Sequence, residues 1–273
     1  MYKRMNEQLQ KEGAMALVTG ASSGIGLAYA RELARRGYDL LLVSNEQERI
    51  GTVAEELAAA FGVKTIPLCM DLARSEAARE LYDYCEREKL QIGILVNNAG
   101  IFFFDDRTEV ASERIETMLL LHIRTVTLLC RYFGAAMKRR RAGYILNMSS
   151  LSAWTPAPGI SVYAASKSYI RKFSQMLRYE LHQYGVGVTT VCPGAIATGL
   201  YNLSDYYQRL ALRLGVMMKP ERLARKGLRA MFARRDYILP GAVNRFFVLA
   251  LYLLPVQLIY YIKEHTKLYR YGR

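Results

Sequence analysis

The stretch AMALVTGASSGIG, residues 14–26, decides the fold. A short apolar run is followed by a turn with glycines at positions 20, 24 and 26, and then by the helical pattern LAYARELARRG. Glycines let a backbone turn tightly and approach a pyrophosphate, which the N–H groups and dipole of the following helix stabilise. The order strand, glycine turn, helix therefore predicts a dinucleotide-binding unit.

Apolar runs alternate with helical patterns along the rest of the chain. The runs DLLLVS, VKTIPLCMD, ILVNNAG, GYILNMSS and VGVTTVCPG read as strands, and helices are expected over 46–61, about 115–137, about 164–184 and about 220–234. This alternation predicts one doubly wound α/β domain over residues 1–240, with helices on both faces of a parallel six- or seven-stranded sheet. Residues 241–273 are expected to form an apolar C-terminal helical extension.

Composition and charge limit the class of protein. The chain has 273 residues, of which 52% are hydrophobic and 23% charged, which is ample for a large core. Its net charge of +14 attracts polyanions, but the basic groups at 138–141 and 222–235 are explained by solvated helix faces and caps. No nucleic-acid-binding signature accompanies them, so no nucleic-acid partner is expected.

Cysteine usage and the leader indicate a cytoplasmic protein. Cys69, Cys85, Cys130 and Cys192 are scattered without a CxxC pair, and the polar start MYKRMNEQLQKEG has no secretory apolar core. No cluster of histidine, cysteine and carboxylate residues suggests a metal. His182 and His265 are read as surface or helix-end residues.

A tyrosine and a lysine one helical turn apart suggest the chemistry. Tyr163 and Lys167 lie in YAASK, and Ser150 lies thirteen residues upstream of the tyrosine. The lysine ammonium is expected to lower the pKa of the phenol towards the working range of a general acid. The serine is expected to hydrogen-bond a substrate carbonyl as charge develops on its oxygen. Spacing alone favours Ser150 over Ser149 and Ser152.

The end of the second strand predicts which cofactor binds. An acidic residue at Ser44 or Asn45 would accept hydrogen bonds from a ribose 2′-hydroxyl and repel a 2′-phosphate, but neither position is acidic. With Arg49 close behind, NADP(H) is favoured and NAD(H) remains possible.

Five ordered motifs together resemble the short-chain dehydrogenase/reductase family from residue 19 to about residue 235. They are TGASSGIG, Asp71 after the third strand, NNAG at 97–100, Ser150 with YAASK, and PGAIAT at 193–198. The resemblance implies a Rossmann-type fold, a homodimer or homotetramer, and an oxidoreductase that interconverts ketones and secondary alcohols. It also implies that Lys167 holds the nicotinamide ribose and that Thr198 contacts the nicotinamide amide. The residues expected to bind the cofactor are Gly20, Ser22, Ser23, Gly24, Ile25, Gly26, Ser44, Asn45, Asp71, Leu72, Asn98, Ala99, Gly100, Tyr163, Lys167, Pro193, Gly194, Ile196 and Thr198.

One position departs from the family pattern. The asparagine that orders a water in the family's proton relay aligns with His122 in LLLHIRT. The imidazole either packs in its helix or remains a member of the relay, since it accepts and donates protons near neutral pH. His122 is therefore counted as a fourth candidate catalytic residue.

The substrate is expected to be a lipophilic ketone or alcohol. The segment GLYNLSDYYQRLALRLGVMMKP, residues 199–220, suggests a lid over an apolar substrate, although core packing uses the same residue types. Within the family the chain is most similar to the branch of very-long-chain 3-oxoacyl-CoA reductases and 17β-hydroxysteroid dehydrogenases. This resemblance implies a 3-oxoacyl lipid, with a hydroxysteroid or small carbonyl compound as the alternative. A protein that binds the nucleotide as a sensor or scaffold without chemistry is the alternative of another class.

The apolar tail at 246–262 has three interpretations. Its seventeen residues contain Pro255 and Gln257, which makes a membrane-spanning helix marginal and two short helices more natural. A lid or subunit contact, an interfacial membrane anchor with basic flanks, and a true span all remain open.

Overall fold

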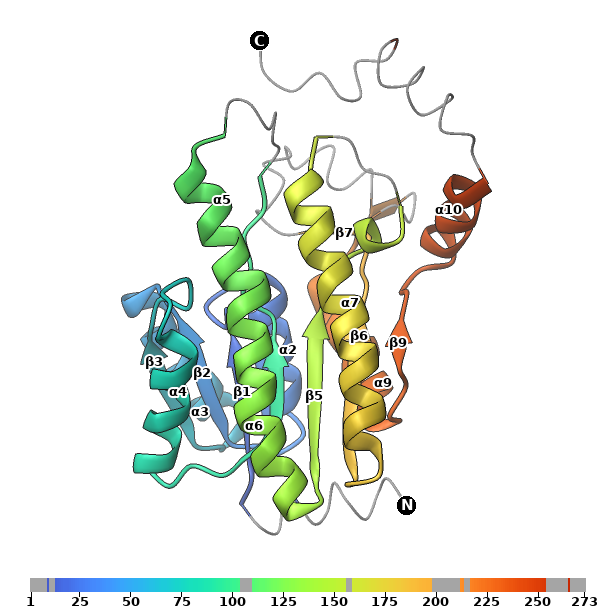
Figure 1. Cartoon of the computed structure of the whole chain (residues 1–273). Helices are drawn as coiled ribbons and strands as arrows, with labels where there is room; N and C mark the ends of the chain where they lie inside the picture. The colour runs from blue at the N-terminus through green and yellow to red at the C-terminus, as the bar shows by residue number, and fades with distance from the viewer. Residues whose placement is uncertain are drawn as a thin grey trace.

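The computed structural model describes Leu9 and residues 13–103, 110–155, 159–197, 212–213, 217–253 and 265. Within these residues, seven parallel strands form one sheet in the order β3-β2-β1-β4-β5-β6-β9 (Figure 1). The strands are β1 (Met15–Thr19), β2 (Leu40–Ser44), β3 (Thr65–Cys69), β4 (Ile92–Asn97), β5 (Gly143–Met148), β6 (Val186–Val191) and β9 (Tyr237–Ile238). This is the doubly wound, Rossmann-type sheet predicted from the sequence. Its winding reverses between β1 and β4, where a crevice opens at the carboxyl ends of the strands.

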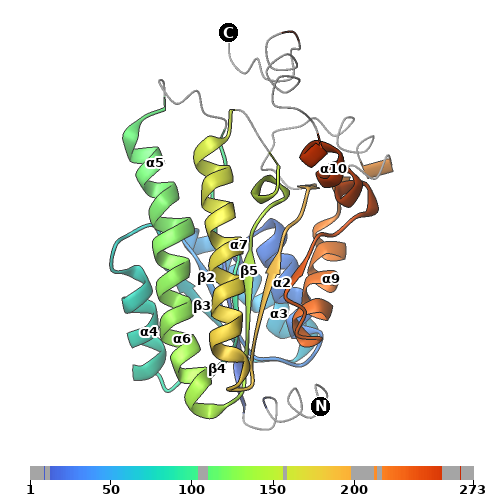
Figure 2. The same ribbon diagram turned by 45° about the vertical axis from the view of Figure 1, so that its right-hand side comes forward.

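Helices cover both faces of the sheet (Figures 1 and 2). One face packs against α2 (Gly24–Ala34), α3 (Gln47–Phe61) and α9 (Pro220–Phe232), and the other against α4 (Ala77–Arg87), α6 (Val126–Arg140) and α7 (Ser161–His182). Successive side chains of a strand point to opposite faces, so Ala16 and Val18 join the first core while Met15 and Leu17 join the second. Burial on both sides explains why central strands such as β1 and β2 read as continuous apolar runs.

The long helix expected near 115–137 has a break in its hydrogen-bond pattern. It runs from α5 (Ser112–Leu119) through a π-helical segment, η1 (Leu120–Thr125), into α6. A single wide turn of this kind inside an α-helix is often found at a functional site. His122 lies within it.

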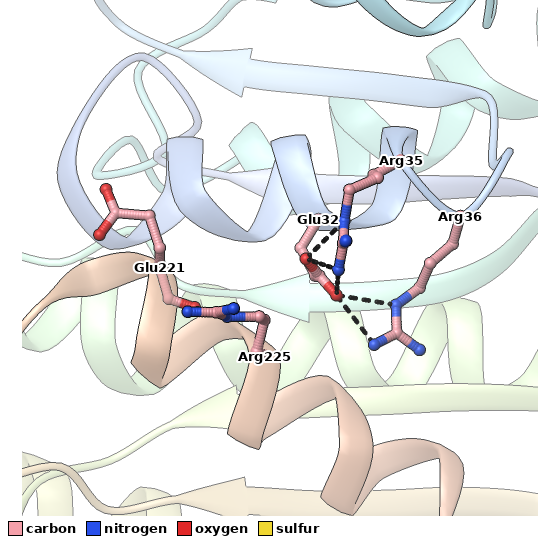
Figure 3. A network of polar contacts seen from close by, with 5 residues as sticks. All are labelled: Glu32, Arg35, Arg36, Glu221 and Arg225. Carbon is pink, nitrogen blue, oxygen red and sulfur yellow. Dashed lines mark hydrogen bonds and ion pairs between the residues drawn. The ribbon is translucent and has the colours of Figure 1, made fainter.

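Helices α2 and α9 pack against each other and share a polar edge. Glu32 of α2 accepts hydrogen bonds from Arg35 at 2.8 Å and from Arg36 at 2.9 Å (Figure 3). Glu221 and Arg225 of α9 lie on the helix opposite this group (Figure 3). The Arg36 guanidinium also lies over the Phe232 ring of α9, 5.2 Å from its centroid, so this positive charge lies where the two helices meet.

Short elements complete the described chain. They are a two-stranded sheet of β7 (Ala195–Ile196) and β8 (Met217–Met218), a 3₁₀ turn η2 (Leu151–Ala153) and the C-terminal helix α10 (Ala242–Leu253). No helix in the described ranges is long and apolar enough to cross a bilayer. Most of the expected lid at 199–220, and the tail beyond Leu253 except His265, lie outside these ranges.

Candidate active site

A cleft of about 720 Å³ opens at the carboxyl ends of the central strands, where the winding reverses. All four candidate catalytic residues and most of the expected cofactor residues line this one cleft. The lining residues that were predicted are Gly20, Ser22, Ser23, Gly24, Ile25, Ser44, Asn45, Asp71, Leu72, Asn98, Ala99, Gly100, His122, Ser150, Tyr163, Lys167, Pro193, Gly194 and Ile196. The fold thus brings together segments more than 170 residues apart.

The glycine turn is shaped to bring backbone close to a ligand. Gly20 and Gly24 have φ angles of +64° and +54°, in the left-handed region that favours glycine. A Cβ at Gly20 would lie 3.0 Å from Cα of Ala99, in the loop after β4. Helix α2 begins at Gly24, so its unpaired N–H groups face this turn. A cradle of backbone at a helix N-terminus fits a dinucleotide pyrophosphate.

Gly26 lies where helix α2 packs against the backbone of the glycine turn. It does not line the cleft, and a Cβ there would overlap the carbonyl oxygen of Gly20. Its lack of a side chain therefore permits helix α2 to approach β1 closely, which is one of the jobs of glycine in such turns.

The end of β2 carries both signs of charge. Ser44 is buried and its hydroxyl bonds Ser22 of the glycine turn at 2.9 Å, so this serine ties two cofactor-facing segments together. Asn45, Glu46 and Arg49 are exposed and line the cleft. Glu46 directly follows the two positions considered from the sequence and was not predicted to take part.

Asp71 and Asn98 shape the loops that they line. The Asp71 carboxylate accepts a hydrogen bond from the N–H of Ala73 at 2.9 Å, which is an Asx turn. The Asn98 side-chain amide donates to the carbonyl oxygens of Thr19, at 3.0 Å, and Gly20, at 3.3 Å. The NNAG segment therefore supports the glycine turn from beside it.

Hydrogen bonds and position in the cleft distinguish Ser150 from its neighbours Ser149 and Ser152. Ser149 is buried and donates to the Lys167 carbonyl oxygen at 2.7 Å, so its hydroxyl proton is engaged in the scaffold. Ser152 does not line the cleft. Ser150 lines it, and its hydroxyl oxygen accepts from the N–H of Ser152 at 3.1 Å, which leaves the hydroxyl proton for a substrate oxygen.

Tyr163 and Lys167 lie on the first turns of α7. The Lys167 Nζ is 5.5 Å from the centroid of the Tyr163 ring and donates to the Met148 carbonyl oxygen at 3.2 Å. Burial lowers the pKa of Lys167 to about 8. The Phe102 ring meets the Tyr163 ring edge to face, with centroids 5.0 Å apart. The tyrosine is thus held between the cation on its own helix and the loop that follows β4.

His122 is buried in the wall of the cleft. Its Nε2 accepts a hydrogen bond from the N–H of Ile101 at 3.1 Å, and its Nδ1 lies 2.9 Å from the hydroxyl oxygen of Ser166. Burial, helped by the charge of Lys167, lowers the pKa of His122 well below its usual range.

Thr198, which was expected to contact the nicotinamide amide, lies outside the described residues. Several residues that line the cleft were not among the expected catalytic or cofactor-binding residues, although Arg49 and Ser149 had been considered. The additional residues that line the cleft are Glu46, Arg49, Met70, Ile101, Leu121, Met148 and Ser149. Most of them lie within two positions of a predicted residue, at a strand end or in the π-helical segment, and Arg49 lies in the first turn of α3, so neighbours of the motifs were the available signal. Over the described ranges, no three side chains of histidine, cysteine or carboxylate residues cluster as metal ligands would.

Comparison with known proteins agrees with this architecture. The sequence pattern of the short chain dehydrogenase family matches residues 14–205. A solved short-chain dehydrogenase from Sphingobium yanoikuyae, in complex with NADPH, is 28% identical with a TM-score of 0.76, covering 95% of this chain and 98% of that one. The chain belongs to the short-chain dehydrogenase family.

Two curated relatives are similar over about 200 residues each. The very-long-chain 3-oxoacyl-CoA reductase of Anas platyrhynchos is 37% identical over 199 residues, which is 70% of this chain and 62% of that protein. The inactive hydroxysteroid dehydrogenase-like protein 1 of Homo sapiens is 32% identical over 206 residues, which is 74% of this chain and 61% of that protein. The match thus covers about three fifths of each relative's length.

Proposed function

We propose that this protein reduces a ketone on a lipophilic substrate, or oxidises the matching secondary alcohol, with NADP(H). The observation that carries the proposal is the position of Ser150, Tyr163 and Lys167 in the same cleft as the glycine turn. A nucleotide held by that turn and a carbonyl compound held by the serine and tyrosine share one cavity. That proximity is what hydride transfer between two bound molecules requires.

The residues divide the chemistry between them. When bound, the reduced nicotinamide supplies the hydride that the carbonyl carbon accepts. Tyr163 gives its phenolic proton to the carbonyl oxygen, and Lys167 stabilises the phenolate that remains. Ser150 donates a hydrogen bond to the same oxygen and holds it as negative charge develops there.

Preference for the 2′-phosphate depends on opposing charges. Arg49 lines the end of the cleft where the ribose 2′ position is expected, and it suits a phosphate. Glu46 lines the same end and opposes a phosphate. The NADPH complex of the Sphingobium relative supports the phosphorylated cofactor.

A 3-oxoacyl lipid is the proposed substrate class. The name of the duck relative supports it, and Ile101, Leu121 and Met148 give the cleft an apolar part. A hydroxysteroid or a small carbonyl compound is the alternative substrate for the same chemistry.

Membrane contact and assembly complete the proposal. Helix α10 exposes 74% of Phe246 and 60% of Leu249, which suits contact of the tail at 246–262 with a membrane surface or with another subunit. We propose a cytoplasmic protein that meets its lipid substrate at such a surface and assembles as a homodimer or homotetramer.

A non-catalytic nucleotide sensor is the rival function. The relative named as inactive supports it, and so does His122 at the position of the family's asparagine. Loss of NADPH absorbance on addition of 3-oxoacyl esters, oxosteroids and small ketones separates the two functions. The proposal expects NADPH to be consumed fastest with the 3-oxoacyl compounds, whereas a sensor binds NADPH and consumes none with any member of the panel.

A further inference from the structure

Both nitrogens of the buried His122 ring have hydrogen-bond partners that lie far apart in the sequence. Nε2 is bonded to the backbone of Ile101, in the loop after β4, at 3.1 Å. Nδ1 is bonded to Ser166, on α7, at 2.9 Å. The Ser166 hydroxyl is also 2.7 Å from the carbonyl oxygen of Tyr163.

These partners define the tautomer of the ring. A backbone N–H only donates, so Nε2 is the acceptor and carries no proton. The single proton of the neutral imidazole is then on Nδ1 and is donated to the Ser166 oxygen. The Ser166 hydroxyl proton is donated in turn to the Tyr163 carbonyl oxygen, since a carbonyl only accepts. Every donor in the series has an acceptor.

We propose that His122 is a positioning residue, which fixes Tyr163 relative to the loop after β4, and that it does not carry protons during turnover. The inference rests on the proposed function, because it concerns the reaction in which Tyr163 is the acid. The series Ile101, His122, Ser166, Tyr163 connects the nucleotide-facing loop to the start of α7.

Proton transfer through the ring conflicts with these contacts. A proton added to Nε2 would face the N–H of Ile101 and break that hydrogen bond. It would also place a cation beside Lys167, the charged group that faces the ring from α7, in a fully buried position. The rings of His122 and Tyr163 have centroids 5.8 Å apart at 71°, so they also pack against each other.

The loop after β4 fits closely over the ring. A Cβ at Gly100 would lie 2.9 Å from Nε2 of His122 and 3.6 Å from Nζ of Lys167. The His122 ring that meets Gly100 comes from the π-helical segment η1. The imidazole therefore lies between the loop after β4, which lines the cleft, and helix α7, which carries the proposed acid.

Nitrogen-15 NMR of the intact wild-type protein with labelled histidine tests the tautomer without any turnover. The chain has three histidines, so the His122 signals are identified as those missing from a His122→Gln variant. We expect a neutral ring with its proton on Nδ1 from pH 5.5 to 8, a window set about the ordinary histidine pKa of about 6.5. A proton on Nε2, or titration of His122 within this window, would overturn the proposal.

Three substitutions test the positioning role in the wild-type background. A glutamine amide reaches the place of Nε2 and keeps the bond to Ile101, an asparagine amide reaches the place of Nδ1 and keeps the bond to Ser166, and phenylalanine keeps neither. We expect kcat to fall about tenfold in His122→Gln and His122→Asn and about a hundredfold in His122→Phe, with the Kd for NADPH changed less than about threefold. The pH dependence of kcat should keep its shape in all three.

Equal loss of kcat in all three variants, or loss of one limb of the pH profile, would assign a proton-carrying role to the ring and contradict the proposal. Activity of His122→Asn at or above that of the wild type would also contradict it. If the wild type reduces no ketone, the proposed function fails, and the NMR measurement still decides the state of the ring.

Discussion

The ammonium group of Lys167 lies 5.5 Å from the centre of the Tyr163 ring, one turn away on the same helix. The lysine side chain is almost fully buried, and burial lowers its pKa to about 8. The charge that the proposed mechanism assigns to Lys167 is therefore lost within an accessible range of pH.

Ketone reduction should slow as pH rises above about 8. Lys167 is then deprotonated and no longer stabilises the Tyr163 phenolate. The measurement is kcat against pH with saturating ketone and NADPH. Lys167→Arg keeps its charge throughout this range, so any activity it retains should not fall at that pH. A fall at the same pH in both proteins would assign it to another group.

Replacing Lys167 with methionine should make the protein more stable at pH 7 while abolishing turnover. The folded pKa of about 8 lies below the ordinary value of 10.5, so the unfolded chain binds this proton more tightly. The resulting loss of stability is complete below pH 8 and is relieved as pH rises from 8 to 10.5. The variant also loses the hydrogen bond to Met148, so its free energy of unfolding at pH 7 should rise by about 2 kcal/mol, which raises Tm by roughly 5 °C.

Lys172→Met is the matched control, because Lys172 is an exposed residue of the same helix. Its Tm should change little. A lower Tm for Lys167→Met than for this control at pH 7 would show that the buried charge stabilises the fold.

Two glycine-to-alanine changes should differ sharply. A Cβ at Gly26 would overlap the backbone carbonyl of Gly20, whereas a Cβ at Gly51, inside helix α3, meets no atom within 4 Å. Gly26→Ala should lower stability by about 2 kcal/mol and weaken NADPH binding at least tenfold, because the turn must shift. Gly51→Ala should leave binding unchanged and stabilise by about 0.5 kcal/mol. Denaturant titration measures the stability of each variant, and NADPH fluorescence measures its affinity for the cofactor. Equal effects of the two substitutions would show that the turn accommodates a Cβ at Gly26 at little cost.

The charges at the end of β2 should set cofactor preference. Arg49→Gln should weaken the binding of NADPH about tenfold and leave the binding of NADH nearly unchanged, because only NADPH carries a 2′-phosphate. Glu46→Gln removes the opposing carboxylate and should strengthen the binding of NADPH. Binding of both nucleotides is measured at low and at high salt, since exposed charge pairs weaken as salt rises. Equal weakening of NADPH and NADH by Arg49→Gln would place the 2′ position elsewhere.

The central strands and their glycine turn were predictable because their signals are local. Apolar runs such as MALV and LLLVS form β1 and β2, and the glycines follow β1 directly. The two-residue strand β9 was missed, since Tyr237 and Ile238 are too few to show a pattern. The π-helical turn at His122 was missed because its apolar spacing resembles that of an α-helix.

The residues expected from the motifs to share a site line one cleft, but their hydrogen bonds could not be predicted. Motif order brought Ser150, Tyr163 and Lys167 to one cleft, yet spacing alone could not show that Ser149 is engaged with the backbone of Lys167. The partners of His122 lie 21 and 44 residues away along the chain, so only the folded structure reveals them. Glu46 was overlooked because it lies two positions beyond the end of β2, after the two positions at which the sequence was considered.

Turnover by Tyr163→Phe, measured together with its affinity for NADPH, tests the central claim most directly. The proposed mechanism predicts that the variant binds NADPH within about threefold of the wild type and loses at least about a hundredfold in kcat with a ketone that the wild type reduces. The tyrosine hydroxyl would then be needed for chemistry and not for binding. Undiminished ketone reduction by Tyr163→Phe would contradict the claim that this phenol protonates the carbonyl oxygen.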